Sequence, residues 1–232
     1  AVGPEKVVKT AHDFGITSPL QPNPSIALGS EEVNLLEHTG AFMTFAKTGL
    51  KVPVYTITKV STKTGEVLFE YKAPEPVRIV DEAVATEMTS MLYGAITQGT
   101  GRAARLVDRP AAGKTGTSSD WKDAWFMGYT GELVTGVWVG NDDGSLMKHV
   151  TGGSLPAAIW KDYMTAALEG VAVTELPGAF PARTGQTIND LKSFYDDLAR
   201  DFGETAGTNS PAPTEQPAAP PPKKKCNWFF CS

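Results

Sequence analysis

The triplet Lys-Thr-Gly occurs three times in this sequence, at Lys47–Gly49, Lys63–Gly65 and Lys114–Gly116. A cation beside a hydroxyl suits an anionic group of a substrate, and a glycine lets the backbone of a ligand come close. The triplet alone is weak evidence for chemistry. The elements that surround each copy must therefore decide which of them can form a site.

The first two copies have complete structural explanations. Lys47–Gly49 ends a predicted helix, Glu31–Lys47, and a lysine in the last turn with a glycine beyond it is an ordinary helix end. Lys63–Gly65 lies between two predicted strands, Lys51–Val60 and Glu66–Tyr71. A glycine there favours the positive φ of a hairpin turn. Neither copy needs a chemical role.

The third copy lies within Ala111–Thr117, which reads Ala-Ala-Gly-Lys-Thr-Gly-Thr, and it opens a strand instead of ending an element. Strands are also predicted at Asp123–Thr130 and Leu133–Gly140. Three consecutive antiparallel strands form a meander, in which the Lys-Thr-Gly strand lies at an edge. An extended peptide can pair with the free backbone groups of such a strand. The alternative is that Lys114 is a surface lysine that guards the edge against aggregation.

A phosphate-binding loop of the form Gly-x-x-x-x-Gly-Lys-[Ser/Thr] also ends in this way, but the sequence opposes it. The first glycine of that motif would stand at position 108, which is Asp108, and an anionic side chain repels phosphate. Pro110 lies inside the loop and removes an N–H that would cradle the ligand. A strand, not a helix, follows the triplet, so the helix dipole is also missing.

The remaining segments predict helices that pack on the sheet. They are Glu5–Phe14, Glu31–Lys47 with Ser30 as its N-cap, a helix from the Asp81 N-cap to about Gln98, and Pro156–Glu169 with Ser154 as a candidate cap. The predicted inward faces are Val33, Leu36, Gly40, Met43 and Ala46; Val84, Met88, Met91, Leu92 and Ala95; and Ile159, Trp160, Tyr163, Met164 and Ala167. Ser18–Leu28 holds three prolines and reads as an extended loop. The fold class is therefore α+β, an antiparallel sheet packed with helices.

Composition excludes several classes of function. The 232 residues carry a formal charge of −5 and a pI near 5.3, which argues against a general binder of nucleic acid or of membrane surfaces. No apolar run approaches the ~20 residues of a membrane span. His12, His38 and His149 are scattered, and Cys226 and Cys231 do not have zinc-site spacing. We expect no metal and no cofactor. The two cysteines can equally be a local disulfide or two free thiols.

The third triplet and its surroundings resemble a known family. Ala111–Thr130 resembles strands of the class A penicillin-binding proteins, the bifunctional enzymes of bacterial peptidoglycan synthesis, whose serine acyltransferase domain carries Lys-Thr-Gly. Three further blocks agree in order, namely Asn23–Gly29 (Asn-Pro-Ser-Ile-Ala-Leu-Gly), Gly136–Asp142 (Gly-Val-Trp-Val-Gly-Asn-Asp) and Gly152–Trp160 (Gly-Gly-Ser-Leu-Pro-Ala-Ala-Ile-Trp). The resemblance covers about Ala1–Gly170. It implies a penicillin-binding transpeptidase fold related to the serine β-lactamases.

The sequence departs from the family at its nucleophile. The family has Ser-x-x-Lys and then Ser-x-Asn upstream of Lys-Thr-Gly, but no Ser-x-Asn occurs here. Ser-x-x-Lys occurs only at Ser119–Lys122 and Ser145–Lys148. Both copies follow the Lys-Thr-Gly motif and lie in predicted turns, so we interpret them as chance matches. We expect the chain to begin just after the second motif, as the C-terminal part of an incomplete transpeptidase domain without the acylated serine.

The resemblance implies a role for each matching residue. Lys114 holds positive charge beside the second-motif serine, assists proton transfer and attracts the substrate carboxylate. Thr115 and Thr117 offer hydroxyls to that carboxylate, Gly116 leaves room for the substrate backbone, and the Thr117 N–H is one donor of the oxyanion hole. Trp121 and Asp120 are candidates for the wall of the cleft, although core packing explains the tryptophan equally well.

The resemblance also implies the organisation and partners of the protein. We expect residues 1–170 to belong to the transpeptidase domain, residues 171–202 to form an extension with an amphipathic helix at Ile188–Phe202, and residues 203–232 to be a disordered Pro/Ala-rich tail. The expected partners are D-Ala-D-Ala stem peptides, β-lactams and the N-terminal half of the same domain. The protein would act outside the cytoplasmic membrane, held by an upstream anchor. The alternatives are a D-Ala-D-Ala carboxypeptidase or β-lactamase, and a non-catalytic sheet module that binds peptides.

Overall fold

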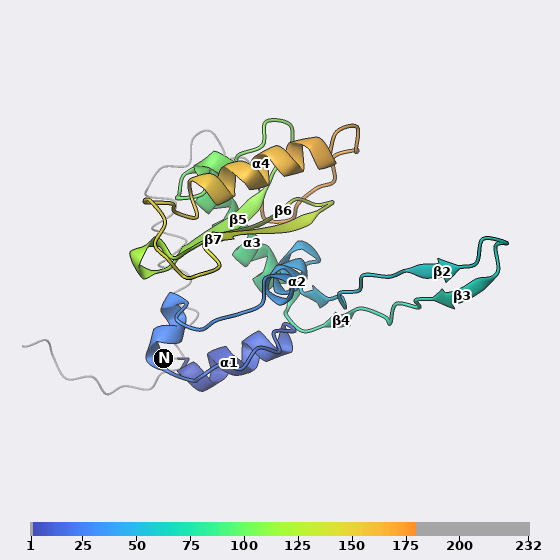
Figure 1. Cartoon of the computed structure of the whole chain (residues 1–232), viewed down its shortest axis with the longest axis horizontal. Helices are drawn as coiled ribbons and strands as arrows, with labels where there is room; N and C mark the ends of the chain where they lie inside the picture. The colour runs from blue at the N-terminus through green and yellow to red at the C-terminus, as the bar shows by residue number, and fades with distance from the viewer. Residues whose placement is uncertain (1, 180–232) are drawn as a thin grey trace, which may run out of the picture. The chain divides into compact units, whose positions relative to one another are not determined.

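Three antiparallel strands carry the third Lys-Thr-Gly triplet in the computed structural model, which describes residues 2–179. The strands are β5 (Ala112–Thr117), β6 (Asp123–Tyr129) and β7 (Val134–Gly140), in the order β5-β6-β7. Helices pack against this sheet (Figure 1), so the predicted α+β class is confirmed. The predicted helix Ile188–Phe202 and the tail from residue 203 lie outside the described residues.

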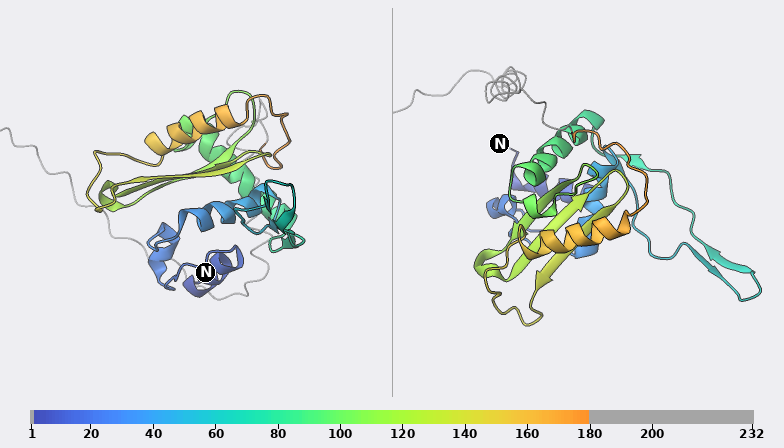
Figure 2. Two further views of the ribbon diagram at one scale, coloured as in Figure 1. Left: turned by 45° about the vertical axis from the view of Figure 1, so that its right-hand side comes forward. Right: turned by 90° about the horizontal axis from the view of Figure 1, so that it is seen from above.

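Helix α4 (Leu155–Ala167) covers one face of the sheet (Figure 2). Trp160 is fully buried there and meets Phe126 of β6 edge-on, with 5.3 Å between the ring centroids. The prediction placed Ile159 and Tyr163 inward as well, and this is wrong, because they are 41% and 53% exposed. The buried stripe of the helix is Pro156, Ala157, Trp160 and Met164. Ala167 is exposed too.

Helix α2 (Leu35–Ala46) packs on the opposite face of the sheet. Its N-cap is Asn34, whose Oδ1 accepts hydrogen bonds from the N–H groups of Leu36 at 2.8 Å and Glu37 at 3.4 Å. The predicted cap, Ser30, is wrong by four residues. The Ser30 hydroxyl lies 2.9 Å from that of Ser25 in the preceding loop. On the predicted inward face, Leu36 is 55% exposed, which is also an error.

The segment that precedes α2 is tied to it through one carboxylate. Glu37 accepts hydrogen bonds from the Thr17 and Ser18 side chains and from both of their backbone N–H groups. These bonds, the Thr17 hydroxyl first, lower the pKa of Glu37 to about 2. Further upstream, α1 (Pro4–Asp13) agrees with the predicted helix. The predicted loop 18–28 contains one short 3₁₀ helix, η1 (Pro24–Leu28).

Helix α3 (Glu82–Thr97) runs past β5 and joins two hydrophobic clusters. The predicted cap is confirmed, since Asp81 Oδ1 accepts from the Ala83 N–H at 2.9 Å. Leu92 packs in the cluster with Tyr129, whose hydroxyl lies 2.9 Å from that of Thr89. Burial raises the pKa of Tyr129 to about 12. Val84 and Met91 of the predicted inward face are instead 54% and 58% exposed.

The first two Lys-Thr-Gly copies lie where the sequence predicts. Lys47 is the C-cap of α2, and Gly49 follows with φ of +94°. Gly65, with φ of +91°, lies at the tip of a hairpin in which the Thr62 N–H donates to the Glu66 carbonyl at 2.8 Å. Both structural explanations are confirmed.

The hairpin differs from its prediction in the length of its strands. The predicted strand Lys51–Val60 is split between β1 (Leu50–Lys51), which pairs with β4 (Val77–Arg78), and β2 (Lys59–Ser61), which pairs with β3 (Val67–Glu70). Every residue of β2 and β3 is exposed, and the pair extends away from the helices and the β5-β6-β7 sheet (Figure 1). Alternating apolar residues therefore mark a strand here without marking a buried face.

Candidate functional site

Strand β5 has a free edge. It pairs with β6 alone among the described residues, as the meander predicts. The Ser118 N–H donates to the Asp123 carbonyl at 2.9 Å at the end of the ladder. Residues of an antiparallel pair alternate in the direction of their backbone groups, so Gly116 and Lys114 also bond toward β6. The N–H and C=O groups of Thr115 and Thr117 consequently point to the free edge.

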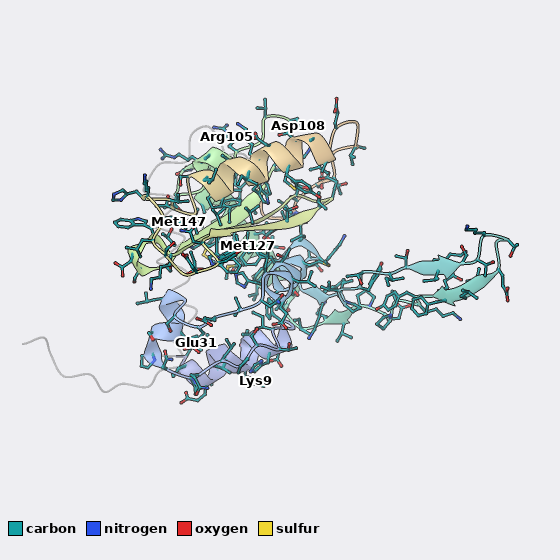
Figure 3. All side chains as sticks on the ribbon, in the orientation of Figure 1. Lys9, Glu31, Arg105, Asp108, Met127 and Met147 are labelled. Atoms are coloured by element: carbon teal, nitrogen blue, oxygen red, sulfur yellow. The ribbon has the colours of Figure 1, made fainter. Side chains whose placement is uncertain are left out.

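Lys114 is exposed, and its ammonium reaches this edge. Its cross-strand partner is Met127, so the two side chains share a face of the sheet. The sulfur of Met127 (labelled in Figure 3) lies 3.7 Å from the hydroxyl oxygen of Thr39 in α2. This face of the sheet is therefore the one toward α2. The Lys114 ammonium then donates to the Thr115 carbonyl at 2.6 Å. The ammonium and the outward backbone of β5 are thus brought together.

The two threonine hydroxyls lie on the other face and have protein partners. The Thr115 hydroxyl is 2.7 Å from that of Thr100, in the turn that follows α3. The Thr117 hydroxyl accepts the Gly152 N–H at 3.1 Å, from the turn that precedes α4. Sequence reasoning missed both partners. Thr100 lies just beyond the helix predicted to end at about Gln98, and Gly152 was noted only as part of a family block.

Close packing against β5 and β6 explains why position 152 is a glycine. A Cβ at Gly152 would lie 2.4 Å from the Gly116 carbonyl oxygen and 2.2 Å from that of Trp125. A Cβ at Gly116 would meet its cross-strand partner instead, at 3.2 Å from Trp125 Cβ. The turn therefore lies directly on the backbone of β5 at the triplet.

The turn after β5 holds an aromatic contact. Asp120 and Trp121 have left-handed backbones, with φ of +61° and +55°. The Trp121 ring is 4.3 Å from that of His149, which has φ of +55° and belongs to the β7–α4 connection. Trp121 is 37% exposed. The two serines of the Ser-x-x-Lys matches, Ser119 and Ser145, are also exposed here, and neither lies at the start of an α-helix.

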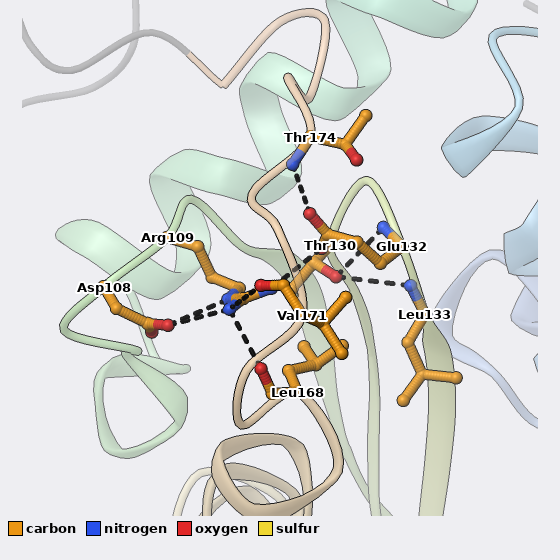
Figure 4. Close-up of polar contacts among 8 residues, drawn as sticks. All are labelled: Asp108, Arg109, Thr130, Glu132, Leu133, Leu168, Val171 and Thr174. Atoms are coloured by element: carbon orange, nitrogen blue, oxygen red, sulfur yellow. Dashed lines mark hydrogen bonds and ion pairs between the residues drawn. The ribbon is translucent and has the colours of Figure 1, made fainter.

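An ion cluster centred on the buried side chain of Arg109 lies beyond the start of β5 (Figure 4). The Arg109 guanidinium, 4% exposed, contacts the carboxylates of Asp108 at 3.0 Å and Glu132 at 3.4 Å. It also donates to the carbonyls of Leu168 at 3.2 Å and Val171 at 3.1 Å. The hydrogen bond to Asp108 raises the pKa of Arg109 and lowers that of Asp108.

The same cluster reaches a second segment through Glu132. The Glu132 side chain is 10% exposed and accepts a hydrogen bond from the Thr174 N–H. Burial alone would raise the pKa of Glu132, but hydrogen bonds involving Thr130 and Thr174, together with Arg109, lower it. The cluster thereby fixes the start of β5 against the β6–β7 turn and the end of α4.

The candidate site lies along the free edge of β5. Cavities of about 330 and 420 Å³ lie along residues 102–111, and neither is lined by Lys114, Thr115 or Thr117. Within residues 2–179, no three His, Cys, Asp or Glu side chains gather as they would around a metal ion. None of the helices in that range is long and apolar enough to cross a membrane.

Comparison with known proteins identifies the family. The model of the penicillin binding protein transpeptidase domain matches residues 2–165. Penicillin-binding protein 1A of Aquifex aeolicus (strain VF5) is 40% identical over 164 residues, which are 70% of this chain and 22% of that protein. Penicillin-binding protein 2D of Bacillus subtilis (strain 168) is 38% identical over 177 residues, or 73% of this chain and 25% of that protein.

Solved structures agree. PonA1 from Mycobacterium tuberculosis in complex with penicillin V is 29% identical, with a TM-score of 0.70, over 81% of this chain and 57% of that one. Penicillin-binding protein 1A from Haemophilus influenzae has the same fold, with a TM-score of 0.68 at 23% identity over 80% of this chain and 36% of that one. The chain belongs to the penicillin-binding protein transpeptidase domain family. It spans about a quarter of the length of these two curated relatives.

Proposed function

We propose that the chain forms one wall of the active site of a peptidoglycan DD-transpeptidase, which cross-links D-Ala-D-Ala stem peptides through a serine acyl-enzyme and is acylated by penicillin. One observation carries this proposal. The Lys114 ammonium and the outward N–H of Thr117 lie at the same free edge of β5. A cation and a backbone donor on an open strand suit an extended peptide that ends in a carboxylate.

The substrate would bind by adding to β5. Its backbone would pair with the outward N–H and C=O groups of Thr115 and Thr117, and Gly116 adds no side chain beside that path. Its carboxylate would take hydrogen bonds from the two threonine hydroxyls and charge from Lys114. The Gly152 N–H already donates to the Thr117 oxygen, so the proton of that hydroxyl is available to a ligand.

The chemical step needs groups from residues upstream of Ala1. A serine hydroxyl would attack the D-Ala-D-Ala carbonyl, pass its proton to a base and expel the terminal D-Ala. An acceptor amine would then take the acyl group. Lys114 would assist the proton transfer. The Thr117 N–H would stabilise the oxyanion together with the N–H of that serine, and one such donor is worth ~10²–10³ in rate. Trp121 and Asp120 would line the cleft.

The proposal extends to the whole protein by likeness to its relatives. It would act at the outer face of the bacterial cytoplasmic membrane, with an N-terminal anchor and a glycosyltransferase domain before the transpeptidase domain. The 232 residues alone would be inactive, because no Ser-x-x-Lys precedes Lys114 and no Ser-x-Asn is present.

Covalent labelling by fluorescent penicillin tests this function. The 232-residue chain and the protein extended upstream through both serine motifs are incubated with the label, denatured and separated by electrophoresis. We expect a labelled band from the extended protein only. A labelled band from the 232-residue chain would show that it holds a nucleophile. An unlabelled extended protein would overturn the proposed function.

A second assay separates the transpeptidase from a hydrolase. The extended protein is given a D-Ala-D-Ala peptide with and without a D-amino acid as acceptor amine. A transpeptidase gives the exchanged peptide in proportion to the acceptor. A carboxypeptidase would give the hydrolysed peptide at every acceptor concentration. A β-lactamase would leave the peptide intact and would hydrolyse penicillin instead.

A further inference from the structure

Thr100 is 15 residues away from Thr115 in the sequence, and their hydroxyl oxygens are 2.7 Å apart. Only one hydrogen can lie between two hydroxyl oxygens. If Thr115 donates to Thr100, it has no proton for a ligand. If Thr100 donates to Thr115, the Thr115 proton is free to point at an anion at the edge of β5. An anion therefore selects the second arrangement.

The backbone around Thr100 is held in place from two sides. The Gly99 and Gly101 N–H groups donate to the carbonyls of Gly94 at 3.0 Å and Ala95 at 2.9 Å, so the turn is fixed to the end of α3. On the other side, a Cβ at Gly153 would lie 2.3 Å from the Thr100 carbonyl oxygen. The hydroxyl is therefore presented to β5 by a turn that is packed between two helix ends.

The neighbouring threonine has an equivalent arrangement. The Gly152 N–H donates to the Thr117 hydroxyl oxygen at 3.1 Å, which also leaves the proton of that hydroxyl for a ligand. Two independent turns, one after α3 and one before α4, thus place a group that can donate a hydrogen bond beside each of the two hydroxyls of β5. A hydroxyl that accepts one hydrogen bond becomes a better donor in the next, because hydrogen bonds in a chain polarise one another.

We propose that Thr100 is a positioning residue for the carboxylate site, which turns the Thr115 hydroxyl into a donor to the terminal carboxylate of the substrate or of a β-lactam. This inference rests on the proposed function, because it assigns to that function's substrate a contact made through Thr115. Thr100 itself does not touch the substrate.

The test compares a penicillin with its methyl ester, which lacks the charged carboxylate, in the extended protein. The measured quantity is the second-order rate constant of acylation for each compound. In Thr100→Val, which keeps the shape and removes the hydroxyl, we expect the rate with the carboxylate to fall about threefold to tenfold, the worth of one neutral hydrogen bond. The rate with the ester stays unchanged. Thr100→Ser keeps the parent's preference for the carboxylate.

The matched control is Thr56→Val, which makes the same replacement at an exposed threonine outside the site and leaves both rates unchanged. An equal fall for the two compounds in Thr100→Val would assign a purely structural role to Thr100 and overturn the inference. An unchanged preference would overturn it as well. If the parent protein reacts with neither compound, the proposed function itself fails, and the two failures are distinguishable.

Discussion

At the scale of single residues, the three Lys-Thr-Gly copies place the same side chain in three surroundings. Lys47 ends a helix, Lys63 lies at a hairpin tip, and Lys114 lies on an edge strand with its ammonium at the Thr115 carbonyl. A triplet has no chemistry of its own. The element that carries it determines whether the lysine and the backbone can face one ligand.

Replacing Lys114 should reduce acylation while replacing Lys63 does not. In the extended protein, Lys114→Ala removes the charge that the proposed mechanism uses in proton transfer, and we expect the rate of penicillin acylation to fall by about a hundredfold or more. Lys63→Ala makes the identical change in an identical triplet, and we expect the parent's rate. Stopped-flow or gel-based acylation rates check both variants. Equal rates in Lys114→Ala and the parent would refute the role given to Lys114.

Glu37 should make the stability of the chain depend on acid pH. Its pKa is about 2 in the folded protein and 4.5 for an ordinary glutamate, because Thr17 and Ser18 donate to the ionised form. The stabilisation is therefore complete above about pH 5 and is lost as the pH falls from 4.5 toward 2. Urea unfolding should give the parent a higher free energy of unfolding than Glu37→Gln at pH 7. This difference should vanish near pH 2.

The control for this prediction removes a donor and keeps the carboxylate. Thr17→Val deletes the hydroxyl that contributes most to the lowered pKa of Glu37. The difference in the free energy of unfolding between Thr17→Val and Thr17→Val/Glu37→Gln should therefore be smaller than that between the parent and Glu37→Gln. It should also vary less with pH. If the difference between the parent and Glu37→Gln is the same at every pH, Glu37 does not carry the proposed linkage.

At the scale of elements, local chemistry in the sequence is a good guide to where elements begin and end. Asp81 caps α3 as predicted, and Gly65 has the positive φ that its hairpin turn requires. Both depend on neighbours within a few residues. Ser30 is not the cap because the helix begins after Asn34, whose side chain accepts hydrogen bonds from two of its N–H groups. Serine and asparagine are both good caps, so residue type alone cannot decide between them.

The orientation of helices was less predictable because distant residues decide it. Trp160 turns inward where Gly128 leaves space, since a Cβ at Gly128 would lie 2.8 Å from the indole ring. Ile159 is apolar too, but it is exposed one position away. Thr100 and Gly152 were missed for the same reason: their contacts with β5 join residues 15 and 35 positions apart, and no local pattern encodes them. The lysine, threonines and glycine of β5 could be chosen as candidates from the sequence because a short motif holds them together.

The β2–β3 hairpin should be dispensable for the fold. All residues of its two strands are exposed, and its nearest inward rung is the hydrogen bond from the Tyr71 N–H to the Thr58 carbonyl at 2.8 Å. Replacing residues 59–70 by Asn-Gly closes the chain at that rung with a favoured turn. We expect the thermal midpoint to change by no more than about 2 °C, since exposed replacements rarely exceed ~0.5 kcal/mol. A loss of ten degrees would show that the hairpin supports the sheet.

At the scale of the whole molecule, two cationic side chains of this acidic chain lie at and just before strand β5. The net charge is −5, yet Lys114 lies within the triplet strand and Arg109 is buried before its start. Arg109 contacts Asp108, Glu132, Leu168 and Val171, so one side chain joins the loop before β5, the β6–β7 turn and the segment after α4. Long-range order in this chain depends on a few such residues.

Removing Arg109 should therefore destabilise the chain strongly. Arg109→Met leaves the Glu132 carboxylate buried without its cation, which typically costs about 3–5 kcal/mol. The double variant Arg109→Met/Glu132→Leu removes both charges and should recover most of the loss. Urea midpoints at pH 7 measure each variant. A double variant as unstable as Arg109→Met would mean that packing and the two carbonyl contacts, and not the unpaired charge, account for the effect.

The exposed turn at Thr62–Gly65 also offers a practical handle on the protein in living cells. Exposed loop tips accept inserted sequence with little disturbance of the elements behind them, and this tip belongs to a hairpin whose strands are wholly exposed. An epitope or a small fluorescent domain placed between Lys63 and Thr64 leaves β5 and both flanking turns untouched. Microscopy of cells that carry such an insertion can follow where the protein lies, with neither end of its chain altered.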